Sequence, residues 1–258
     1  MRIKSPGHVV FAVAMIILGI LGLIKHNFAP IWQPVPKSVP AQTVLVYLCA
    51  LIPLVCGVGL LLRATAAVAS RVLLIYSLLW LLLLKVPYTI KERTIDYWFS
   101  ACEIAVMVAG AWVLYTWLAS DWDRKHLGFM SGKTGLRMAR ILYGLALIPF
   151  GIAHFLYIER TASMVPHYLP WHVGWAYFTG GAFIAAGIAI IIGVYARMAA
   201  TLSVLEISVF IVLVWIPIIM KKPGPFDWVE FEVSCELAAA AWVVAESYRG
   251  SRWASVRG

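Results

Sequence analysis

The sequence predicts an all-α polytopic membrane protein, a helical bundle of eight transmembrane helices arranged as two parallel four-helix repeats. Hydrophobic residues make up 62% of the 258 residues and charged residues only 13%, whereas soluble domains are about 45–50% apolar and about 25% charged. So few charges cannot cover a water-soluble protein of this length, which excludes the ordinary globular, disordered and disulfide-scaffold classes. The apolar residues also form runs of membrane-crossing length, and the two halves of the chain match each other.

The eight spans follow from the length of the apolar runs. A helix needs roughly 17–25 predominantly apolar residues to cross the bilayer. Only helices or closed barrels satisfy the backbone in lipid, and these runs lack the alternation of barrel strands. The eight runs cover residues 8–24, 42–62, 66–87, 97–118, 137–157, 173–194, 197–219 and 228–247.

The basic residues predict the orientation of these spans. Eight spans place both termini on one side, and that side carries 13 of the 21 lysines and arginines. Because basic residues concentrate in cytoplasmic loops, we expect both termini and the 119–136 loop in the cytoplasm, and the protein in a prokaryotic inner (plasma) membrane. The net charge of +9 is thus a topology signal. No basic helix with interleaved aromatic residues predicts a nucleic-acid partner, so the expected partner is the lipid bilayer.

The halves of the chain align with each other. A shift of 130 residues brings the Pro-rich segment 35–40 onto 165–170, and a shift of 133 brings the Cys-Glu pair at Glu103 onto the one at Glu236. Each unit has an even number of spans, so the two copies are expected to share one orientation, as parallel repeats do in some transporters. The predicted units are a first repeat at 1–118, a cytoplasmic linker at 119–136, and a second repeat with a basic tail at 137–258.

Several motifs of the second half resemble a known family. They are Arg140, Gly144, Gly151-x-x-His154-Phe155, Val165-Pro166-x-x-Leu169-Pro170, Thr179-Gly180-Gly181 and Arg197-x-Ala199-Ala200. Through them residues 140–246 resemble the DoxX-like integral membrane proteins, and the first half is similar more weakly, through His26, its Val-Pro-x-x-Val-Pro loop and Arg63. The resemblance implies a tandem duplication of a four-helix unit. Because the family is named for association with a membrane thiosulfate:quinone oxidoreductase, it also implies other membrane or redox subunits as partners.

Three acidic residues fall inside the predicted spans. A central Asp, Lys or Arg costs roughly 2.5–3.5 kcal/mol in the bilayer, so ionisable groups there are the first candidates for function. Glu103 lies six residues into the fourth span and could form an ion pair with Lys85 of the third. Glu236 holds the equivalent place in the eighth span and has no matching lysine. We expect it to meet His154, since a carboxylate–imidazole pair near water can exchange protons around neutral pH.

Glu206 is the third acid and lies near the middle of the seventh span. Two interpretations stay open. It is either a neutral acid that donates one hydrogen bond between helices, through Ser203, Ser208 or a tyrosine, or a proton-accepting or ligand-orienting group in an intramembrane cavity.

Histidine and aromatic residues gather at the outer face of the second half. Tryptophan and tyrosine collect at the membrane boundary whatever the function. The alternative is a pocket under the second Pro-rich loop, whose aromatic walls would suit a quinone head group. No metal site is predicted. The candidate residues are His154, His167, Trp171 and His172, with Glu159, Arg160 and Asp227 at the border of the pocket.

These features lead to three hypotheses, which leave open whether the protein is an enzyme. The first is a redox-linked membrane subunit that binds a quinone-like lipophilic molecule near the outer leaflet, anchored by Glu236 and His154, with electrons from a partner protein. The second is a non-catalytic structural or assembly subunit of a larger membrane complex. The third is a small-solute transporter with a polar path that includes Glu206. The first requires a lipid-accessible cavity beside Glu236.

Overall fold

The computed structural model of the chain describes residues 4–254, and every secondary-structure element in that range is a helix. The first half contains α1 (Pro6–Lys25), the 3-10 helix η1 (Pro30–Trp32), α2 (Gln42–Leu61), α3 (Ala66–Trp80), the π-helix η2 (Leu81–Lys85), α4 (Val86–Glu92) and α5 (Ile95–Leu118). Two short helices follow, α6 (Asp121–His126) and α7 (Gly128–Ser131). The second half contains α8 (Lys133–Leu156), α9 (Ile158–Met164), α10 (His172–Ile192), α11 (Ala196–Phe210), the π-helix η3 (Ile211–Trp215), α12 (Ile216–Ile219) and α13 (Pro225–Glu246). The all-α prediction is confirmed.

Within the described residues, seven helical segments are long and apolar enough to cross a membrane. They coincide with the first seven spans expected from the sequence, so the chain has the character of an integral membrane protein. Two of the seven are composite: α3 continues through η2 into α4, and α11 through η3 into α12. The eighth expected span corresponds to α13, whose 22 residues reach about 33 Å at 1.5 Å per residue. Its first twelve residues carry four acids, and this makes the helix too polar to be counted with the others.

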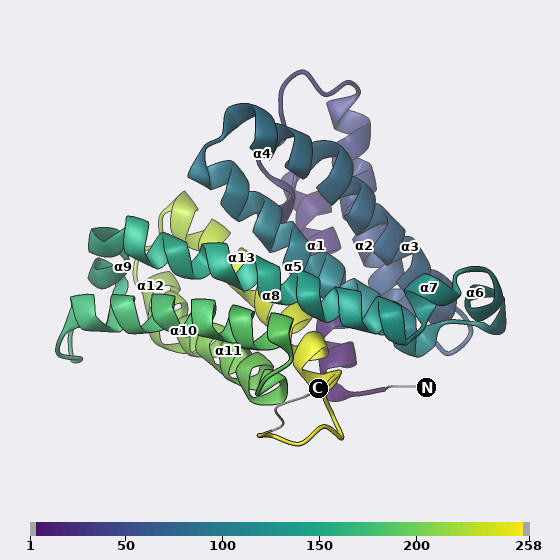
Figure 1. The fold of residues 1–258 in the computed structure, drawn as a ribbon. Helices are drawn as coiled ribbons and strands as arrows, with labels where there is room; N and C mark the ends of the chain where they lie inside the picture. The colour runs from purple at the N-terminus through teal and green to yellow at the C-terminus, as the bar shows by residue number, and fades with distance from the viewer. Residues whose placement is uncertain (1–3, 255–258) are drawn as a thin grey trace.

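Helix α5 lies at the centre of the bundle (Figure 1). Of its apolar window 83% is buried, against 17–44% for the other six candidate spans. It packs against α3, α8 and α13, while α13 packs against α5, α11 and α1. Small residues allow the close contact between α5 and α13, since a Cβ on Gly110 would stand 3.0 Å from the Cα of Ala240. The two central helices thus bring the two halves of the chain together.

Each half begins with a pair of helices in close contact. Helix α1 packs along α2, and α8 packs along α10. Glycines permit both contacts. A Cβ on Gly57 would stand 2.7 Å from the carbonyl oxygen of Ala12, and one on Gly187 would stand 2.6 Å from that of Gly144. The backbones approach so closely that no side chain fits between them, as in small-residue contacts of membrane helices.

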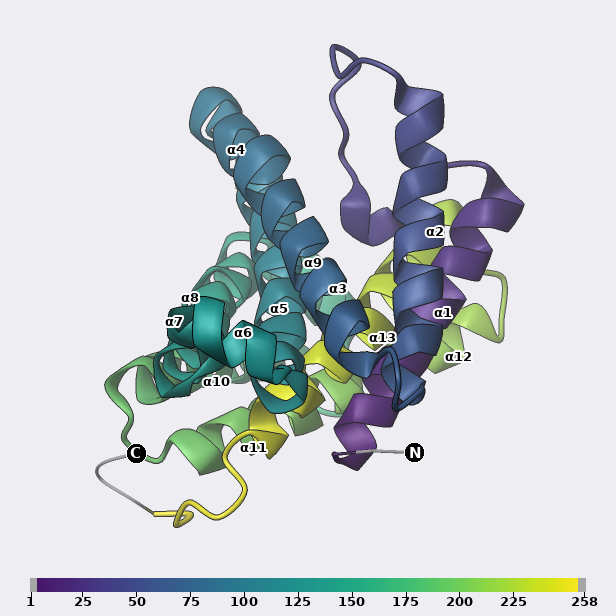
Figure 2. The ribbon, with the colours of Figure 1, turned by 90° about the vertical axis from the view of Figure 1, so that its right-hand side faces the viewer.

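The third span of each half contains a π-helix followed by a proline. Leu81–Lys85 precedes Pro87, and Ile211–Trp215 precedes Pro217. Proline has no backbone N–H to donate to the preceding turn, and in membrane helices local π-type turns accommodate this loss. The two described chain ends lie at the same end of the bundle, in Figure 1 and in the perpendicular view of Figure 2.

Candidate functional site

Glu103 interrupts the buried stretch of α5, the candidate span with the largest buried share. From Ser100 to Tyr115 every residue of α5 is buried except Glu103, which is half-buried. A residue at the centre of a bundle keeps solvent access only where the packing around it is incomplete. Phe99, one turn earlier on the same face, stacks against Phe150 of α8 with 6.1 Å between ring centroids. Glu103 therefore lies beside an aromatic contact between the two halves.

Glu236 lies across from Glu103, on α13. Its side chain is buried, with 6% of its surface exposed, and its Oε2 atom has no hydrogen-bond partner. The charges of Glu103 and Glu232 both act on it. A buried carboxylate oxygen with no partner is costly, because the desolvation of the oxygen is not offset by a hydrogen bond. The two acids that the sequence aligns between the halves therefore lie near each other where α5 and α13 pack together.

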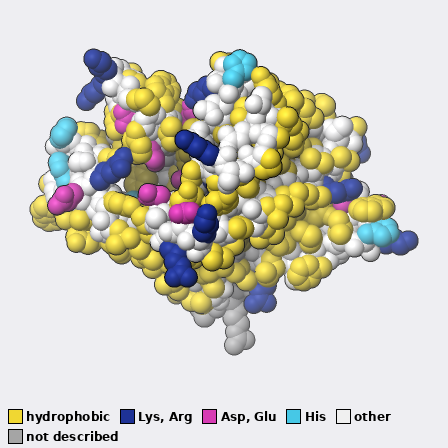
Figure 3. Space-filling model, turned by 90° about the horizontal axis from the view of Figure 1, so that it is seen from above, with side chains coloured by type: hydrophobic (Ala, Val, Ile, Leu, Met, Phe, Trp, Pro, Cys, Tyr) yellow, Lys and Arg dark blue, Asp and Glu magenta, His cyan; other side chains and the backbone are white. Residues whose placement is uncertain are grey.

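Two further acids of α13 complete what we call the glutamate cluster, Glu103, Glu230, Glu232 and Glu236. Glu232 forms an ion pair with Lys25 at the end of α1, and the charge of Arg160 acts on Glu230. Figure 3 shows acidic side chains around a hollow in the surface seen from above, with basic side chains at its edge. Within the cluster Glu230 and Glu232 each have a nearby cation, whereas Glu236 keeps an unpartnered oxygen.

Lys85 does not form the ion pair with Glu103 that the sequence suggests. In the described structure the Lys85 Nζ lies more than 4.0 Å from the carboxylate oxygens of Glu103. Lys85 is buried, and its Nζ donates to the carbonyl oxygen of Gln33 and to Ser100 Oγ, both at 2.5 Å. The Ser100 hydroxyl donates to the same carbonyl at 2.7 Å. Lys85 therefore fastens the first Pro-rich loop onto α5, and its charge acts on Glu103 from a distance.

Replacing Lys85 by methionine is expected to destabilise this attachment by about 2 kcal/mol, because a charge-assisted hydrogen bond inside the protein is lost. Cleavage by trypsin after Lys37 in the loop should become several-fold faster, and thermal unfolding of the purified protein should begin at a lower temperature. Lys91→Met, on the exposed surface of α4, is the matched control. Equal effects of the two substitutions would contradict the role assigned to Lys85.

His154 is not paired with Glu236. Its Nδ1 lies 2.8 Å from the carbonyl oxygen of Phe150, one turn earlier on α8. Its ring stacks on Phe210 of α11 at 5.9 Å and meets Phe183 of α10 at 5.5 Å. The contact with Phe150 lies within α8, so a partner on another helix would have to compete with it. The imidazole ring instead forms part of an aromatic cluster with Phe183 and Phe210. The sequence did not predict that cluster, because its members lie on three helices.

Glu206 lies near the hydrogen-bonded pair of Tyr143 on α8 and Ser203 on α11. Tyr143 OH and Ser203 Oγ are 2.8 Å apart, and the Ser208 hydroxyl donates to Val204 O. The partners expected for Glu206 are therefore engaged elsewhere, and its Oε1 is buried without a hydrogen bond. It is not a member of the glutamate cluster.

Of the residues expected at the outer face of the second half, His167 and Trp171 are exposed and His172 is half-buried. Trp171 is 86% exposed and has a left-handed backbone at the start of α10. The rings of His167 and His172 meet at 6.2 Å. In residues 4–254 no three His, Cys, Asp or Glu side chains are grouped closely enough to hold a metal ion. At the border of the expected pocket, the Arg160 guanidinium lies 4.1 Å from the Phe226 ring centroid. A cavity of about 450 Å³ lies at the first Pro-rich loop, lined by His26, Gln33 and Tyr47 among others.

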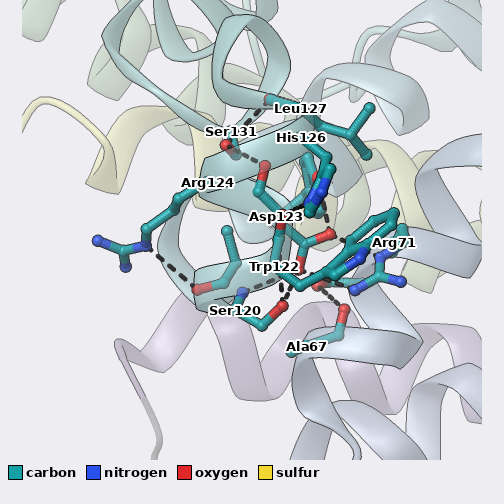
Figure 4. A network of polar contacts seen from close by, with 12 residues as sticks. Ala67, Arg71, Ser120, Trp122, Asp123, Arg124, His126, Leu127 and Ser131 are labelled. Carbon is teal, nitrogen blue, oxygen red and sulfur yellow. Dashed lines mark hydrogen bonds and ion pairs between the residues drawn. The ribbon is translucent and has the colours of Figure 1, made fainter.

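A polar network around Asp123 was not foreseen from the sequence (Figure 4). Asp123 of α6 is fully buried and forms an ion pair with Arg71 of α3, 2.6 Å from Nε to Oδ1. Tyr115 OH donates to the same oxygen at 3.0 Å, and the Ser120 N–H and hydroxyl donate to Oδ2 at 2.8 and 2.5 Å. Burial alone would raise the pKa of Asp123, but the hydrogen bonds from Arg71, Ser120 and Tyr115 outweigh it and lower the pKa to about 2. The Ser-x-x-Asp capping box at 120–123 was the available signal.

Comparison of the chain with protein-family models, with curated proteins and with solved structures gives no match. The similarity to DoxX-like proteins therefore stays a prediction. The function of the site is inferred only from the chemistry of its residues.

Proposed function

We propose that the chain is an integral membrane protein made of two parallel four-helix repeats, 1–118 and 137–258. Three observations support this. The π-helices at 81–85 and 211–215 are separated by 130 residues, as are Gly57 and Gly187 at the two close helix crossings. Helices α1, α2, α3 and α5 also pack in the same order as α8, α10, α11 and α13. A duplicated unit explains why these features recur at one spacing.

In this arrangement α13 is the eighth span. It is long enough to cross the hydrocarbon core. Its acids do not argue against this, because Glu236 is buried in protein and Glu232 is paired with Lys25. Polar groups at membrane depth are tolerated where they face the bundle interior. An even number of spans also agrees with the two chain ends lying at one end of the bundle.

We further propose that the glutamate cluster and the aromatic side chains beside it bind a small lipophilic molecule with carbonyl or hydroxyl groups, of the quinone class. The observation that carries this proposal is that Glu103, accessible in an otherwise buried stretch of α5, lies close enough for its charge to act on Glu236, which has an unpartnered oxygen. Flat aromatic walls with a few convergent polar groups are typical of such sites. Phe99, one helical turn from Glu103, and Phe150 supply a pair of stacked rings.

The roles of the side chains follow from their chemistry. A bound quinone or quinol would supply two-electron, two-proton redox chemistry. Glu236 and Glu103 would accept hydrogen bonds from hydroxyl groups when ionised and donate to carbonyl oxygens when protonated. Lys85 would stabilise the charge of Glu103. Electrons would have to come from a partner redox subunit, in keeping with the expected family resemblance.

Binding of decylubiquinone tests the proposal. In phosphatidylcholine nanodiscs, saturable quenching of tryptophan fluorescence is expected for the native protein. Glu103→Gln and Glu236→Gln should each weaken binding roughly tenfold, which corresponds to the loss of one charge-assisted hydrogen bond. Glu206→Gln is the matched control, because Glu206 is also a carboxylate among the helices but outside the cluster, and it should leave the affinity unchanged.

Two outcomes would contradict this assignment. Quenching that rises linearly with the quinone concentration in the bilayer, without saturation, would show partition into lipid only. An equal loss of affinity in Glu206→Gln would show that the cluster has no specific part in binding.

A further inference from the structure

A second hollow lies at the opposite end of the bundle from the first Pro-rich loop, beside the Asp123 network. Its volume is about 400 Å³, within the range of small-molecule sites. It opens between the α2–α3 turn and the α5–α6 junction. Its lining residues are Arg63, Ala66, Ala67, Leu118, Ala119, Ser120, Asp121 and Arg124. We call it the arginine pocket.

Both guanidinium groups of the arginine pocket keep hydrogen-bond donors that no residue in 4–254 engages. Neither Arg63 nor Arg124 has an ion-pair partner within 4.0 Å in residues 4–254. The Arg124 Nε donates to Ala119 O at 3.4 Å, which orients the side chain, and its two terminal amino groups have no hydrogen-bond partner among the described residues. In Figure 4 the Arg124 guanidinium points away from the Asp123 network, whereas Arg71 is turned into it.

Two arginines of the second half at this end of the bundle are engaged by the protein. Arg140 Nε donates to Ser247 Oγ at 2.9 Å and its guanidinium stacks on Tyr248. Arg197 donates to Ser251 O at 2.6 Å and stacks on Trp253. Both hold the chain that follows α13. In the described part of the chain Arg63 and Arg124 hold no such segment, so most of their donors remain available.

The charge and surroundings of the arginine pocket fit one class of ligand. With Asp121 on its rim, the pocket residues carry a net charge of about +1, which matches the single negative charge of a phosphodiester. The Asp123 carboxylate does not add to this balance, because Arg71 neutralises it. Next to the lining residues, Leu62 and Val68 are 53% and 54% exposed, and Trp122 on α6 is 53% exposed. Apolar side chains at the rim would meet acyl chains while the arginines meet the headgroup.

We propose that the arginine pocket binds the phosphodiester headgroup of an anionic membrane lipid, on the side of the membrane that carries the chain termini. Basic pockets between helices on the cytoplasmic side are a recurring form of lipid recognition. Arginine suits the role because its planar fork donates two parallel hydrogen bonds to phosphate oxygens. The small side chains of Ala66, Ala67 and Ala119 leave room for the headgroup. The site is independent of the glutamate cluster.

Native mass spectrometry of the detergent-purified protein tests this proposal. After titration with phosphatidylglycerol, the native chain is expected to retain one lipid tightly and phosphatidylcholine at least tenfold more weakly. Arg63→Gln and Arg124→Gln should each lower the affinity for phosphatidylglycerol about fivefold, in line with about 1 kcal/mol per basic residue at a membrane surface. Arg124→Lys, which keeps the charge without the fork, should lie between the native chain and Arg124→Gln. Arg137→Gln, an exposed arginine on α8 at the same end, is the matched control and should bind like the native chain.

The remaining outcomes would overturn the proposal. If inorganic phosphate at millimolar concentration displaced the lipid, the site would take free phosphate. If Arg137→Gln caused the same loss, or phosphatidylcholine bound equally well, the affinity would reflect only the general positive charge of this surface. Because Arg63 and Arg124 are exposed, these variants are expected to fold, and an unchanged thermal unfolding profile verifies this.

Discussion

Replacing Asp123 by alanine is expected to lower the free energy of unfolding by about 3 kcal/mol. The substitution leaves Arg71 and the hydroxyl of Tyr115 without the acceptor that now binds both of them. Removing one partner of a buried, hydrogen-bonded ion pair costs about 3–5 kcal/mol, and the partial exposure of Arg71 places the effect at the lower end of this range. Thermal or denaturant unfolding of the purified protein measures the change. Asp121→Ala is the control, because Asp121 is exposed on the same helix and should change stability by less than about 0.5 kcal/mol.

The same carboxylate predicts a dependence of stability on pH. The pKa of Asp123 is lowered to about 2 in the folded chain, against about 3.9 for an unfolded aspartate. The folded state therefore binds the proton less readily than the unfolded state, and the resulting stabilisation of about 2–3 kcal/mol is fully present above pH 4. It is lost as the pH falls through 4 toward 2. Asp123→Asn should remove this acid-induced loss, and an unchanged pH profile in that variant would contradict the role of Asp123.

Gly151→Ala is expected to have an effect of similar size, about 3 kcal/mol, at the contact between α8 and α10. A Cβ on Gly151 would stand 2.3 Å from the carbonyl oxygen of Gly180, which is backbone and cannot rotate away. The two helices would have to separate, and inserting atoms into a packed contact costs about 1–3 kcal/mol or more. The loss should be largest for Gly151→Leu. Unfolding of the purified protein in detergent reports the change.

Gly181 offers the matched control one residue beyond the contact. No atom lies within 4 Å of a Cβ placed there. Gly181→Ala should therefore stabilise α10 slightly, by about 0.5–1 kcal/mol, because alanine has the higher helix propensity. If the two substitutions had equal effects, the stability of the pair would not depend on the close approach of α8 and α10.

The spans were predictable because each is a continuous local pattern. An apolar run such as 42–62 specifies a helix whatever its neighbours are, since the backbone in lipid must satisfy its own hydrogen bonds. Helix α13 differs from the other spans, because its acids make its sequence resemble that of an exposed segment. Only its packing against α5, α1 and α11 explains how these acids are accommodated. Its place as a membrane span remains part of the proposal.

The candidate residues were predictable as a set but not as pairs. Charge in an apolar run identifies Glu103, Glu206 and Glu236 without any knowledge of their neighbours. Their partners depend on helix rotation, which sequence spacing does not fix. Lys85 forms hydrogen bonds with Gln33 and Ser100 rather than an ion pair with Glu103. His154 contacts a carbonyl oxygen of its own helix and the rings of an aromatic cluster rather than Glu236.

The sequence by itself determined that the chain is helical and built for a membrane, where seven of its helices begin and end to within a few residues, and which acids are unusual. The tertiary structure decided that Glu103 and Glu236 lie near each other between the halves, that the buried Asp123 pairs with Arg71, and that Arg63 and Arg124 have no ion-pair partner among residues 4–254. The reason is physical. Helix formation depends on residues within one or two turns, whereas the partner of a buried charge depends on which faces of distant helices come to pack together.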